Sequence, residues 1–216
     1  MNASVALLKR LHWLGHASFR LDGPPVIYFD PWQLKGKLPQ ADLILVSHDH
    51  FDHCSPDDVA RITNISTVIV ASEEAAKKLR GDVRPIRPGE RMSIGEVEVE
   101  AVPAYNTNKF RSPGVPFHPR EAGYVGYIVT LGGERIYFAG DTDHIPEMSG
   151  LRCDVALLPI GGTYTMDAEE AARAAADIQP RVVVPMHWGK GVVGSRSDVE
   201  RFLKAYRGEV IVLETE

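Results

Sequence analysis

A short run of histidines and acids constrains this chain more than any other feature of its sequence. Residues 47–53 read Ser-His-Asp-His-Phe-Asp-His, so three imidazoles and two carboxylates fall within residues 48–53. The run follows residues 43–46, an apolar stretch of strand length, and precedes Ser55-Pro56-Asp57-Asp58, a helix start with a cap residue, a first-turn proline and two early acids. The sequence therefore predicts a loop between a strand and a helix in which several metal-ligating side chains lie close together.

The side chains of this loop are those that a divalent cation needs. Neutral imidazole and carboxylate are the usual ligands of zinc, manganese and iron. His48 and His50, two residues apart, can converge on one ion, while Asp52 and His53 can turn toward a second. A solvent-exposed polar loop is the alternative interpretation, but the position at a strand-to-helix junction favours a metal site.

The remaining sequence predicts two similar sets of strands and helices. Each set begins with antiparallel strands and ends with strands that alternate with helices. We expect strands over 11–14, 17–21, 26–29, 43–46 and 67–70 with a helix over 73–79, and then strands over 96–102, 124–131, 135–139, 155–158 and 182–185 with a helix from Asp167, a helix over 198–206 and a last strand over 210–213. This order predicts an α/β (α+β) fold, a four-layer αβ/βα sandwich in which two mixed sheets pack face to face with helices outside.

Two segments in the second half carry more specific expectations. Residues 96–102 alternate strictly between polar and apolar side chains, which predicts an edge or outer strand with one wet face. Residues 103–123 form a long connection with Pro, Asn and Gly. Because long structureless loops in compact domains are usually functional or mobile, this connection is a candidate substrate loop.

Length and charge narrow the class of partner. With 216 residues and 44% hydrophobic content, the chain can bury one ordinary core, and we expect a single domain over 1–216. A net charge of −5 offers no basic surface for extended nucleic acid, because phosphate neutralisation needs clustered Lys and Arg. A small-molecule substrate is the expected partner, and the sequence leaves open whether the chain forms a homo-oligomer.

Cysteine content and hydropathy indicate the cellular compartment in which the protein is expected. The two cysteines, Cys54 and Cys153, are too few for a disulfide framework and are typical of reduced thiols. The first residues lack the basic segment and apolar run of a signal peptide. No uncharged apolar run is long enough to span a bilayer. These features predict a cytoplasmic protein with no membrane partner.

Several motifs together resemble the metallo-β-lactamase superfamily. His48-x-His50-x-Asp52-His53 is similar to the superfamily's signature, and other segments match its remaining motifs in order: Phe29-Asp30-Pro31 the first, Gly140-Asp141-Thr142 the fourth and Pro185-Met186-His187-Trp188 the fifth. Residues 14–18 and 158–166 resemble the small single-domain branch that includes ascorbate-6-phosphate lactonase and predicted metal-dependent hydrolases.

The resemblance implies a set of ligands and a reaction. By it, His48, His50 and a histidine of the third motif hold one metal, Asp52, His53 and His187 hold another, and Asp141 bridges them. The implied cofactor is Zn²⁺ or Mn²⁺, up to two ions, and Asp52, Asp141 and His187 form the catalytic set. The implied activity is hydrolysis of an ester, lactone or phosphodiester by metal-activated water.

Two further residues are expected beside the ligands. Asp30 follows an apolar strand, and we expect its buried carboxylate to accept the free N–H of a ligand histidine, since such partners fix the tautomer and the ring orientation. His16 follows a glycine turn. The resemblance places it near the site but outside the set of ligands.

The third motif departs from the superfamily's pattern. Where the branch usually places a histidine, this chain reads Pro103-Ala104-Tyr105-Asn106, and an asparagine is a poor ligand for a transition metal. His118, in the same connection, could reach the vacant position. It could equally be a surface histidine in a Pro-flanked loop, with the first metal weakly held.

Other residues are candidates for substrate contact. Gly162 and Tyr164 precede the helix that begins near Asp167, so backbone N–H groups and the phenol could face an anionic or polar substrate. The loop cations Lys109, Arg111 and Arg120 could bind phosphate or carboxylate, although scattered loop cations are usually only solvated.

Two other functions fit part of the pattern. The same ligands can hold a single iron, as in a dioxygenase-like oxidoreductase. Asn106 motivates a second alternative, a non-catalytic binding protein with a degenerate metal site. A nuclease is disfavoured by the acidic balance of the chain.

Overall fold

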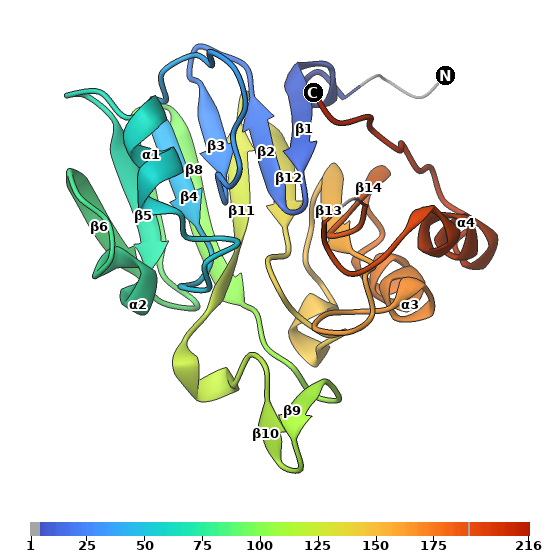
Figure 1. Ribbon diagram of the computed structural model, residues 1–216. Helices are drawn as coiled ribbons and strands as arrows, with labels where there is room; N and C mark the ends of the chain where they lie inside the picture. Colours follow the sequence, from blue (N-terminus) through green and yellow to red (C-terminus); the bar gives the residue numbers. More distant parts are fainter. Residues whose placement is uncertain (1–4, 190) are drawn as a thin grey trace.

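Two six-stranded sheets carry the fold in this computed structural model, which describes residues 5–189 and 191–216 (Figure 1). The N-terminal sheet has the order β1-β2-β3-β4-β5-β6, with β1 at Leu11–Gly15, β2 at Ser18–Leu21, β3 at Ile27–Phe29, β4 at Leu43–Val46, β5 at Val68–Ser72 and β6 at Asp82–Ile86. The C-terminal sheet has the order β14-β13-β12-β11-β8-β7, with β7 at Arg91–Ile94, β8 at Val97–Pro103, β11 at Val125–Leu131, β12 at Glu134–Phe138, β13 at Val155–Pro159 and β14 at Val182–Met186. Residues 1–4, which belong to the segment examined for a signal peptide, lie outside the described residues.

Each sheet changes from antiparallel to parallel pairing along its width. In the N-terminal sheet, β1, β2 and β3 pair antiparallel, whereas β3, β4, β5 and β6 pair parallel. In the C-terminal sheet, β7, β8, β11 and β12 pair antiparallel, whereas β12, β13 and β14 pair parallel. The antiparallel strands expected at the start of the chain are confirmed, and the strands expected over 124–131 and 135–139 pair as an antiparallel hairpin around Gly132-Gly133.

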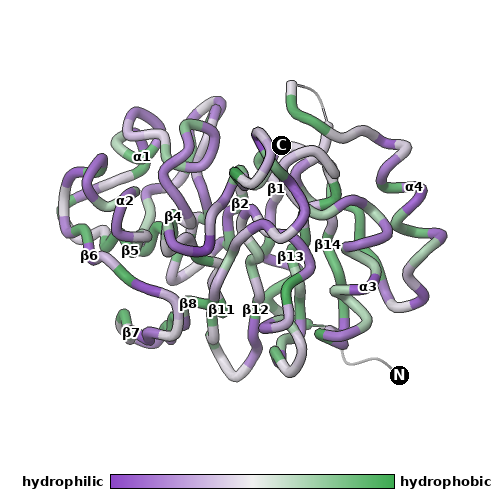
Figure 2. The backbone as a smooth tube through the Cα atoms, turned by 90° about the horizontal axis from the view of Figure 1, so that it is seen from below, coloured by the Kyte–Doolittle hydropathy of each residue, from purple (hydrophilic) through white to green (hydrophobic). Residues whose placement is uncertain are grey.

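Helices cover the outer faces of the two sheets. Seen from below, the strands form two rows, with α1 and α2 beyond the N-terminal sheet and α3 and α4 beside β13 and β14 (Figure 2). The helices and 3-10 turns are α1 at Pro56–Ile62, α2 at Glu73–Ala76, α3 at Ala168–Ile178, α4 at Arg196–Ala205, η1 at Leu7–Arg10, η2 at Arg120–Ala122 and η3 at Pro146–Met148. The four-layer αβ/βα sandwich of two mixed sheets is confirmed.

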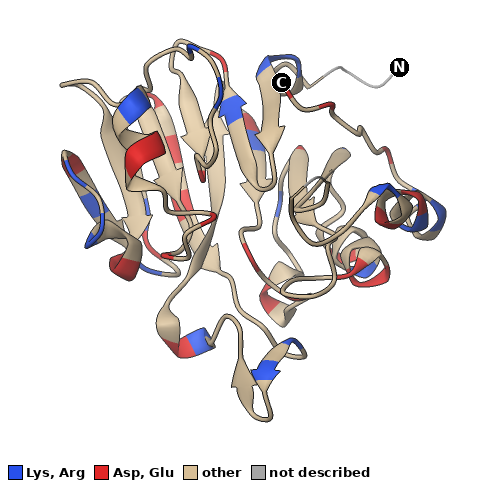
Figure 3. Cartoon of the chain, in the orientation of Figure 1, with Lys and Arg blue, Asp and Glu red and all other residues tan. Residues whose placement is uncertain are grey.

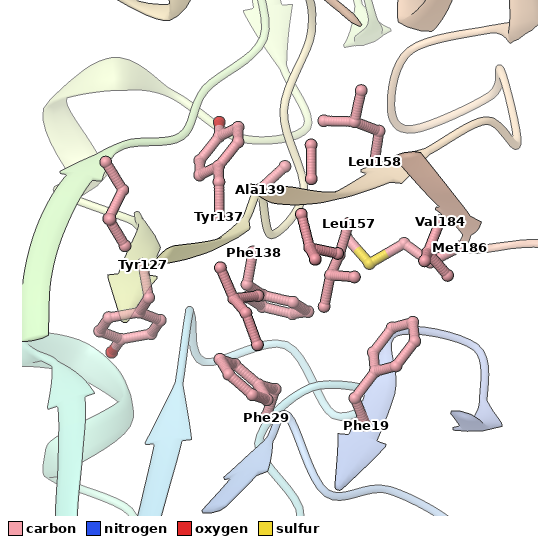
Figure 4. Packing of buried hydrophobic residues seen from close by; sticks show 14 of the residues in the cluster. Phe19, Phe29, Tyr127, Tyr137, Phe138, Ala139, Leu157, Leu158, Val184 and Met186 are labelled. Atoms are coloured by element: carbon pink, nitrogen blue, oxygen red, sulfur yellow. The ribbon is translucent and has the colours of Figure 1, made fainter. Parts of the chain in front are cut away.

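The core fills the space between the sheets. Phe29 of the N-terminal sheet packs on Phe138 of the C-terminal sheet with ring centroids 5.3 Å apart, and Phe19 and Leu157 lie beside them (Figure 4). Side chains on β4 alternate, as the period of a strand requires. Leu43 and Leu45 belong to this inter-sheet cluster, while the residues between and after them pack under α1 and α2 in a second cluster. Burial on both faces explains the continuous apolar run of β4.

Several expected elements differ from the structure. β8 is not at the edge, because β7 pairs with its outer side. The strand expected over 210–213 does not form; Val210 makes an isolated bridge to Val183 instead. The helix expected over 73–79 ends at Ala76. Neither β6 nor β7 was expected. Within the described residues, every helix is too short or too polar to cross a membrane.

The connection after β8 is also more ordered than expected. Its β9 strand at Phe110–Ser112 pairs antiparallel with β10 at Val115–Pro116. This pair belongs to neither main sheet and projects below the sandwich (Figure 1). We call residues 107–119 the β9–β10 hairpin segment.

The sheets place the candidate residues at one edge of the sandwich. Asp30 follows β3, the loop 47–53 follows β4, Asn106 follows β8, Asp141 follows β12 and His187 follows β14. Strands of one direction within each sheet end at the same edge, so these residues converge although they are far apart in the sequence.

Candidate metal centre

Asp141 lies at the centre of the converging histidines. Its Oδ1 is 3.2 Å from Nε2 of His53, and its Oδ2 is 3.3 Å from Nε2 of His187 and 3.4 Å from Nε2 of His118. The carboxylate is almost fully buried. One acidic residue therefore faces imidazoles from both halves of the chain.

The first group of ligating atoms belongs to His48, His50 and His118. Each offers one nitrogen, and the three nitrogens lie within 4.8 Å of one another. Nε2 of His118 is 3.2 Å from Nδ1 of His50. The structure thus places His118, reached through the β9–β10 hairpin segment, beside the two histidines of the strand-end loop.

The second group combines His16, Asp52, His53 and His187. Their ligating atoms also lie within 4.8 Å of one another. His16, expected near the site but outside the ligands, has its Nε2 3.5 Å from Oδ2 of Asp52. The geometry therefore adds a fourth donor to the three that the motifs implied.

Asp30 orients the loop 47–53 through hydrogen bonds. Its Oδ2 is 2.6 Å from Nδ1 of His53, and its Oδ1 accepts the backbone N–H of Ser47 at 2.7 Å. The Ser47 hydroxyl also donates to Asp30, which leaves its oxygen to accept from Nδ1 of His48 at 2.9 Å. These contacts use one nitrogen of each ring, so that Nε2 of His48 and Nε2 of His53 point to the site.

Asn106 holds His118 in a comparable way. Its Oδ1 accepts the backbone N–H of His118 at 2.8 Å and lies 2.9 Å from Nδ1 of the ring. Its Nδ2 donates to Oδ1 of Asp143 at 3.0 Å and to the carbonyl of Tyr164 at 2.9 Å. Asn106 thus contacts the candidate ligand rather than replacing it.

The backbone at the site adopts an uncommon conformation. His16, Asp30 and His187 have φ angles of 53°, 39° and 58°, in the left-handed region that non-glycine residues rarely enter. The turn at His187 also needs a glycine opposite it, because a Cβ on Gly161 would lie 2.6 Å from the carbonyl oxygen of His187. Such conformations cost of order 1–3 kcal/mol each and concentrate at functional sites, where the surrounding structure enforces them.

The donor atoms fit a divalent cation. Within the described residues, several buried atoms of the site have no hydrogen-bond partner: Nε2 of His48, Nε2 of His53, Oδ1 of Asp141 and both ring nitrogens of His187. His53 and Asp141 lie close together, but their atoms are not aligned as a hydrogen bond. Buried polar atoms are normally satisfied, so a convergent set of unsatisfied imidazole and carboxylate atoms calls for a bound ion.

The electrostatics of the site agree with this chemistry. Burial lowers the pKa of His48 well below its ordinary value and that of His118 to about 4, which keeps both rings in the neutral form that binds metals. Burial alone would also lower the pKa of His53, but Asp141 and Asp30 raise it well above the ordinary value. Two buried carboxylates therefore favour positive charge at this position.

Other candidates lie differently from what the sequence suggested. The N–H of Gly162 donates to the carbonyl of Met166 at 3.1 Å, so this amide is already hydrogen-bonded within the chain. Lys109 is not a free loop cation; its Nζ is 2.5 Å from Oε2 of Glu170 and 3.6 Å from Oδ1 of Asp143. Tyr164 does line a cavity over the ligands.

Two adjoining cavities open over the candidate ligands. One, of about 380 Å³, includes Phe117 and Arg111 in its walls, and the other, of about 450 Å³, includes Trp32; both contain Phe51. These aromatic residues could not be singled out from the sequence, because aromatic side chains in loops follow no recognisable spacing. The position of Phe117 next to His118 is the one signal that could have indicated it.

Comparison with known proteins agrees with the site. A sequence profile described as the beta-lactamase superfamily domain matches residues 10–187. A UPF0173 metal-dependent hydrolase of Methanoculleus marisnigri is 37% identical over 187 residues, which cover 83% of this chain and 80% of that protein. One from Thermoplasma acidophilum is 34% identical over 217 residues, covering 93% of this chain and 92% of the relative.

The fold has a matching relative among solved structures. The crystal structure of a metal-dependent hydrolase from Parabacteroides distasonis superposes with a TM-score of 0.81 at 34% identity, covering 95% of this chain and 93% of that one. Sequence and fold similarity thus extend over nearly the whole chain, and both groups of candidate ligands lie within the matched range 10–187. The chain belongs to the metallo-β-lactamase superfamily and, within it, to the UPF0173 metal-dependent hydrolases.

Proposed function

We propose that this chain is a hydrolase of small molecules that uses up to two divalent cations, Zn²⁺ or Mn²⁺. His48, His50 and His118 would hold one cation, and Asp52, His53 and His187 the other, with Asp141 between them and His16 beside the second group. The observation that carries the proposal is the set of buried, unpartnered imidazole and carboxylate atoms that converge from both sheets.

Bound cations at these positions would acidify a water molecule and polarise the oxygen of an electrophilic centre. The residues of the chain compensate charge and orient the ligand rings. The carboxylates of Asp52 and Asp141 offset cationic charge, and Asp141 faces both groups. Asp30 and Asn106 fix ring orientations through the hydrogen bonds described above. Because such orienting partners hold ligands in place before substrate arrives, the site is preorganised for catalysis.

The cavities support a small ester, lactone or phosphodiester as substrate. Volumes of about 380 and 450 Å³ suit a metabolite-sized molecule. The similarity of residues 14–18 and 158–166 to the lactonase-containing branch favours a lactone or phosphorylated compound among these classes, and the net charge of −5 argues against a long nucleic acid.

The test is to measure metal content and activity together. His48→Ala and His53→Ala, made separately, should each lose bound metal and hydrolysis of lactones, phosphodiesters and esters in parallel, because each removes a donor from a different group. His12→Ala is the matched control. His12 lies outside the site, near Asp22 and Glu216, so this variant should retain metal and activity.

Three outcomes would contradict the proposal. Hydrolysis by metal-free variant protein would exclude the cations from the reaction. One iron per wild-type chain, with oxidation rather than hydrolysis, would favour an oxidoreductase. Substoichiometric metal with no turnover on any of these substrates would indicate a binding protein.

A further inference from the structure

The smaller cavity over the ligands has one wall that the proposed function does not use. Four of its lining residues are candidate ligands: His50, Asp52, His118 and Asp141. The others are Phe51, Arg111, Phe117 and Tyr164. Three aromatic residues and one arginine thus line the same cavity as four candidate metal ligands.

Arg111 is the cation of this wall, and it lacks a carboxylate partner. Its guanidinium carbon lies 5.9 Å from the centroid of the Phe117 ring, and no ion pair or hydrogen bond joins it to another described residue. The other loop cations are paired: Lys109 with Glu170, and Arg120 with Glu147 at 2.7 Å. Among these three, Arg111 alone both lines the cavity and is free to bind an anion.

The β9–β10 hairpin segment that carries Arg111 contains no acidic residue. Residues 107–119 hold two cations and no Asp or Glu, and Figure 3 shows basic colour without acidic colour on this hairpin. Since Glu170 of α3 pairs with Lys109, Arg111 is the cation of this segment that lines the cavity without a counterion among the described residues. An anionic group of a bound molecule would supply that counterion.

The base of the segment is anchored close to the candidate ligands. Backbone N–H groups of Thr107 and Asn108 donate to Oδ2 of Asp143 at 2.6 and 2.8 Å, and Lys109 pairs with Glu170. Asp143 also accepts from Asn106, the residue that orients His118. The same contacts thus anchor both a candidate ligand and the backbone that leads to Arg111, two residues beyond Lys109.

The wall beside the guanidinium is aromatic. The rings of Phe117 and Tyr164 meet edge to face, with centroids 4.8 Å apart. Phe51, on the histidine loop, is 76% exposed and borders the same cavity. Apolar surface next to a guanidinium lowers the local dielectric and strengthens a charge-assisted pair, and the planar fork of Arg matches carboxylate and phosphate.

From these observations we infer that Arg111 binds an oxyanion, a carboxylate or a phosphate group, that belongs to the substrate but does not react. The inference rests on the proposed function and narrows it to small esters, lactones or phosphodiesters with a second anionic group. Arg111 is then a specificity-determining residue, and the apolar part of the substrate lies against Phe117 and Tyr164.

The test compares two esters that differ in this group. Metal-loaded wild type, Arg111→Gln and Arg111→Lys are assayed on p-nitrophenyl benzoate and on mono-p-nitrophenyl terephthalate, whose para carboxylate cannot reach its own ester carbonyl. For the terephthalate ester, Arg111→Gln should raise KM about tenfold to a hundredfold with little change in kcat, because one charge-assisted pair is lost. The benzoate ester should change less than about twofold, and Arg111→Lys should fall between. Arg120→Gln, on the same connection but paired with Glu147, should leave both esters unaffected.

Two results would overturn the inference. An equal loss on both esters would mean that Arg111 supports the site as a whole, and no loss on either would mean that its contact with Phe117 is only packing. Metal content must stay equal to wild type in every variant.

A binding measurement separates this inference from the proposed function. If wild type cleaves neither ester, the proposed ester hydrolysis fails, but the inference is still tested by calorimetric titration of metal-loaded protein with succinate and, separately, inorganic phosphate. Affinity at least about tenfold weaker in Arg111→Gln supports the inference, and the anion that shows the loss identifies the group. Equal affinities in wild type and variant for both anions contradict it.

Discussion

Asn106 takes the place of a histidine in the third motif, yet it keeps a role in the same part of the site. Its side-chain oxygen faces both the backbone and the ring of His118, and its amide donates to Asp143 and to the carbonyl of Tyr164. A histidine at position 106 could not make the same set of contacts, because its side chain has neither a carbonyl oxygen nor an NH₂ group. One residue thus orients a candidate ligand that lies twelve positions further along the chain.

Removing this amide should weaken the first metal position. Asn106→Ala leaves Nδ1 of His118 without its partner, and loss of such an orienting partner typically costs about tenfold to a hundredfold in metal affinity. Competition with a chromophoric chelator measures the affinity of each cation. Asn108→Ala is the control, since Asn108 bonds to Glu170 and not to His118. Unchanged affinity in Asn106→Ala would mean that the backbone alone positions His118.

At the scale of single residues, the sequence predicted which side chains form the site better than it predicted which residues each side chain contacts. The ligand loop, Asp30, Asp141 and His187 stand in a recognisable order along the chain, so their convergence could be expected. The choice between Lys109 and Arg111 could not. Both are loop cations two residues apart, and only the position of Glu170, on a distant helix, decides that the first is paired and the second is free.

At the scale of elements, α3 serves both as a layer of the sandwich and as an anchor. Its N-terminus has a capping box in which Glu170 accepts the backbone N–H of Asp167 and the Asp167 side chain accepts that of Glu170. The same Glu170 carboxylate also accepts from Lys109 and Asn108. Burial raises the pKa of Glu170, but these hydrogen bonds outweigh burial and lower the pKa below its ordinary value of 4.5.

This carboxylate should give stability that depends on pH. A group whose pKa is lowered by folding contributes stability above its unfolded pKa, and that contribution is lost as the pH falls through the folded pKa. Glu170→Gln should therefore lower the free energy of unfolding by about 1–2 kcal/mol near neutral pH, and the difference from wild type should shrink as the pH falls below 4.5.

Urea unfolding of metal-free protein across this pH range measures the difference. Glu169→Gln, one residue earlier and exposed, is the matched control and should show little change at any pH. A difference for Glu170→Gln that stays constant with pH would contradict an ionised anchor.

Elements with clear periodicity were predicted, and those defined by their neighbours were not. The hairpin around Gly132-Gly133 and α3 with its capping box carry local signals. β6 contains Pro85 and has a weak apolar pattern, so its pairing with β5 had no local signature. The strict alternation of β8 correctly indicated one wet face but not an edge, because β7 pairs beside it while one face stays uncovered.

At the scale of the whole molecule, the candidate metal centre draws its residues from both sheets. The loop 47–53 and Asp30 extend from the N-terminal sheet, whereas Asp141 and His187 extend from the C-terminal sheet. The order of strands and helices was enough to predict the sandwich. It could not predict how closely the two strand-end edges approach, since that distance follows from packing such as that of Phe29 on Phe138.

A centre built from both sheets should stabilise the folded chain when it is loaded. A cation present at a hundredfold its dissociation constant adds about 2.7 kcal/mol, so removal by a chelator should lower the Tm by roughly 5–10 °C. Differential scanning calorimetry with and without chelator measures the shift. The double variant His48→Ala with His53→Ala should show no shift. If the Tm of the wild type is the same with and without chelator, ions are not bound across the sheets.

The β9–β10 hairpin segment stands apart from the sandwich, so its tip can change in sequence without disturbing the two main sheets. Its strands pair with each other and with neither main sheet, so substitutions at the hairpin tip leave the inter-sheet core untouched. Surface segments of this kind tolerate sequence change far better than packed strands do. Relatives could therefore diverge in the molecules that they recognise by altering the tip of this hairpin, while the scaffold and the candidate metal ligands, His118 among them, stay the same.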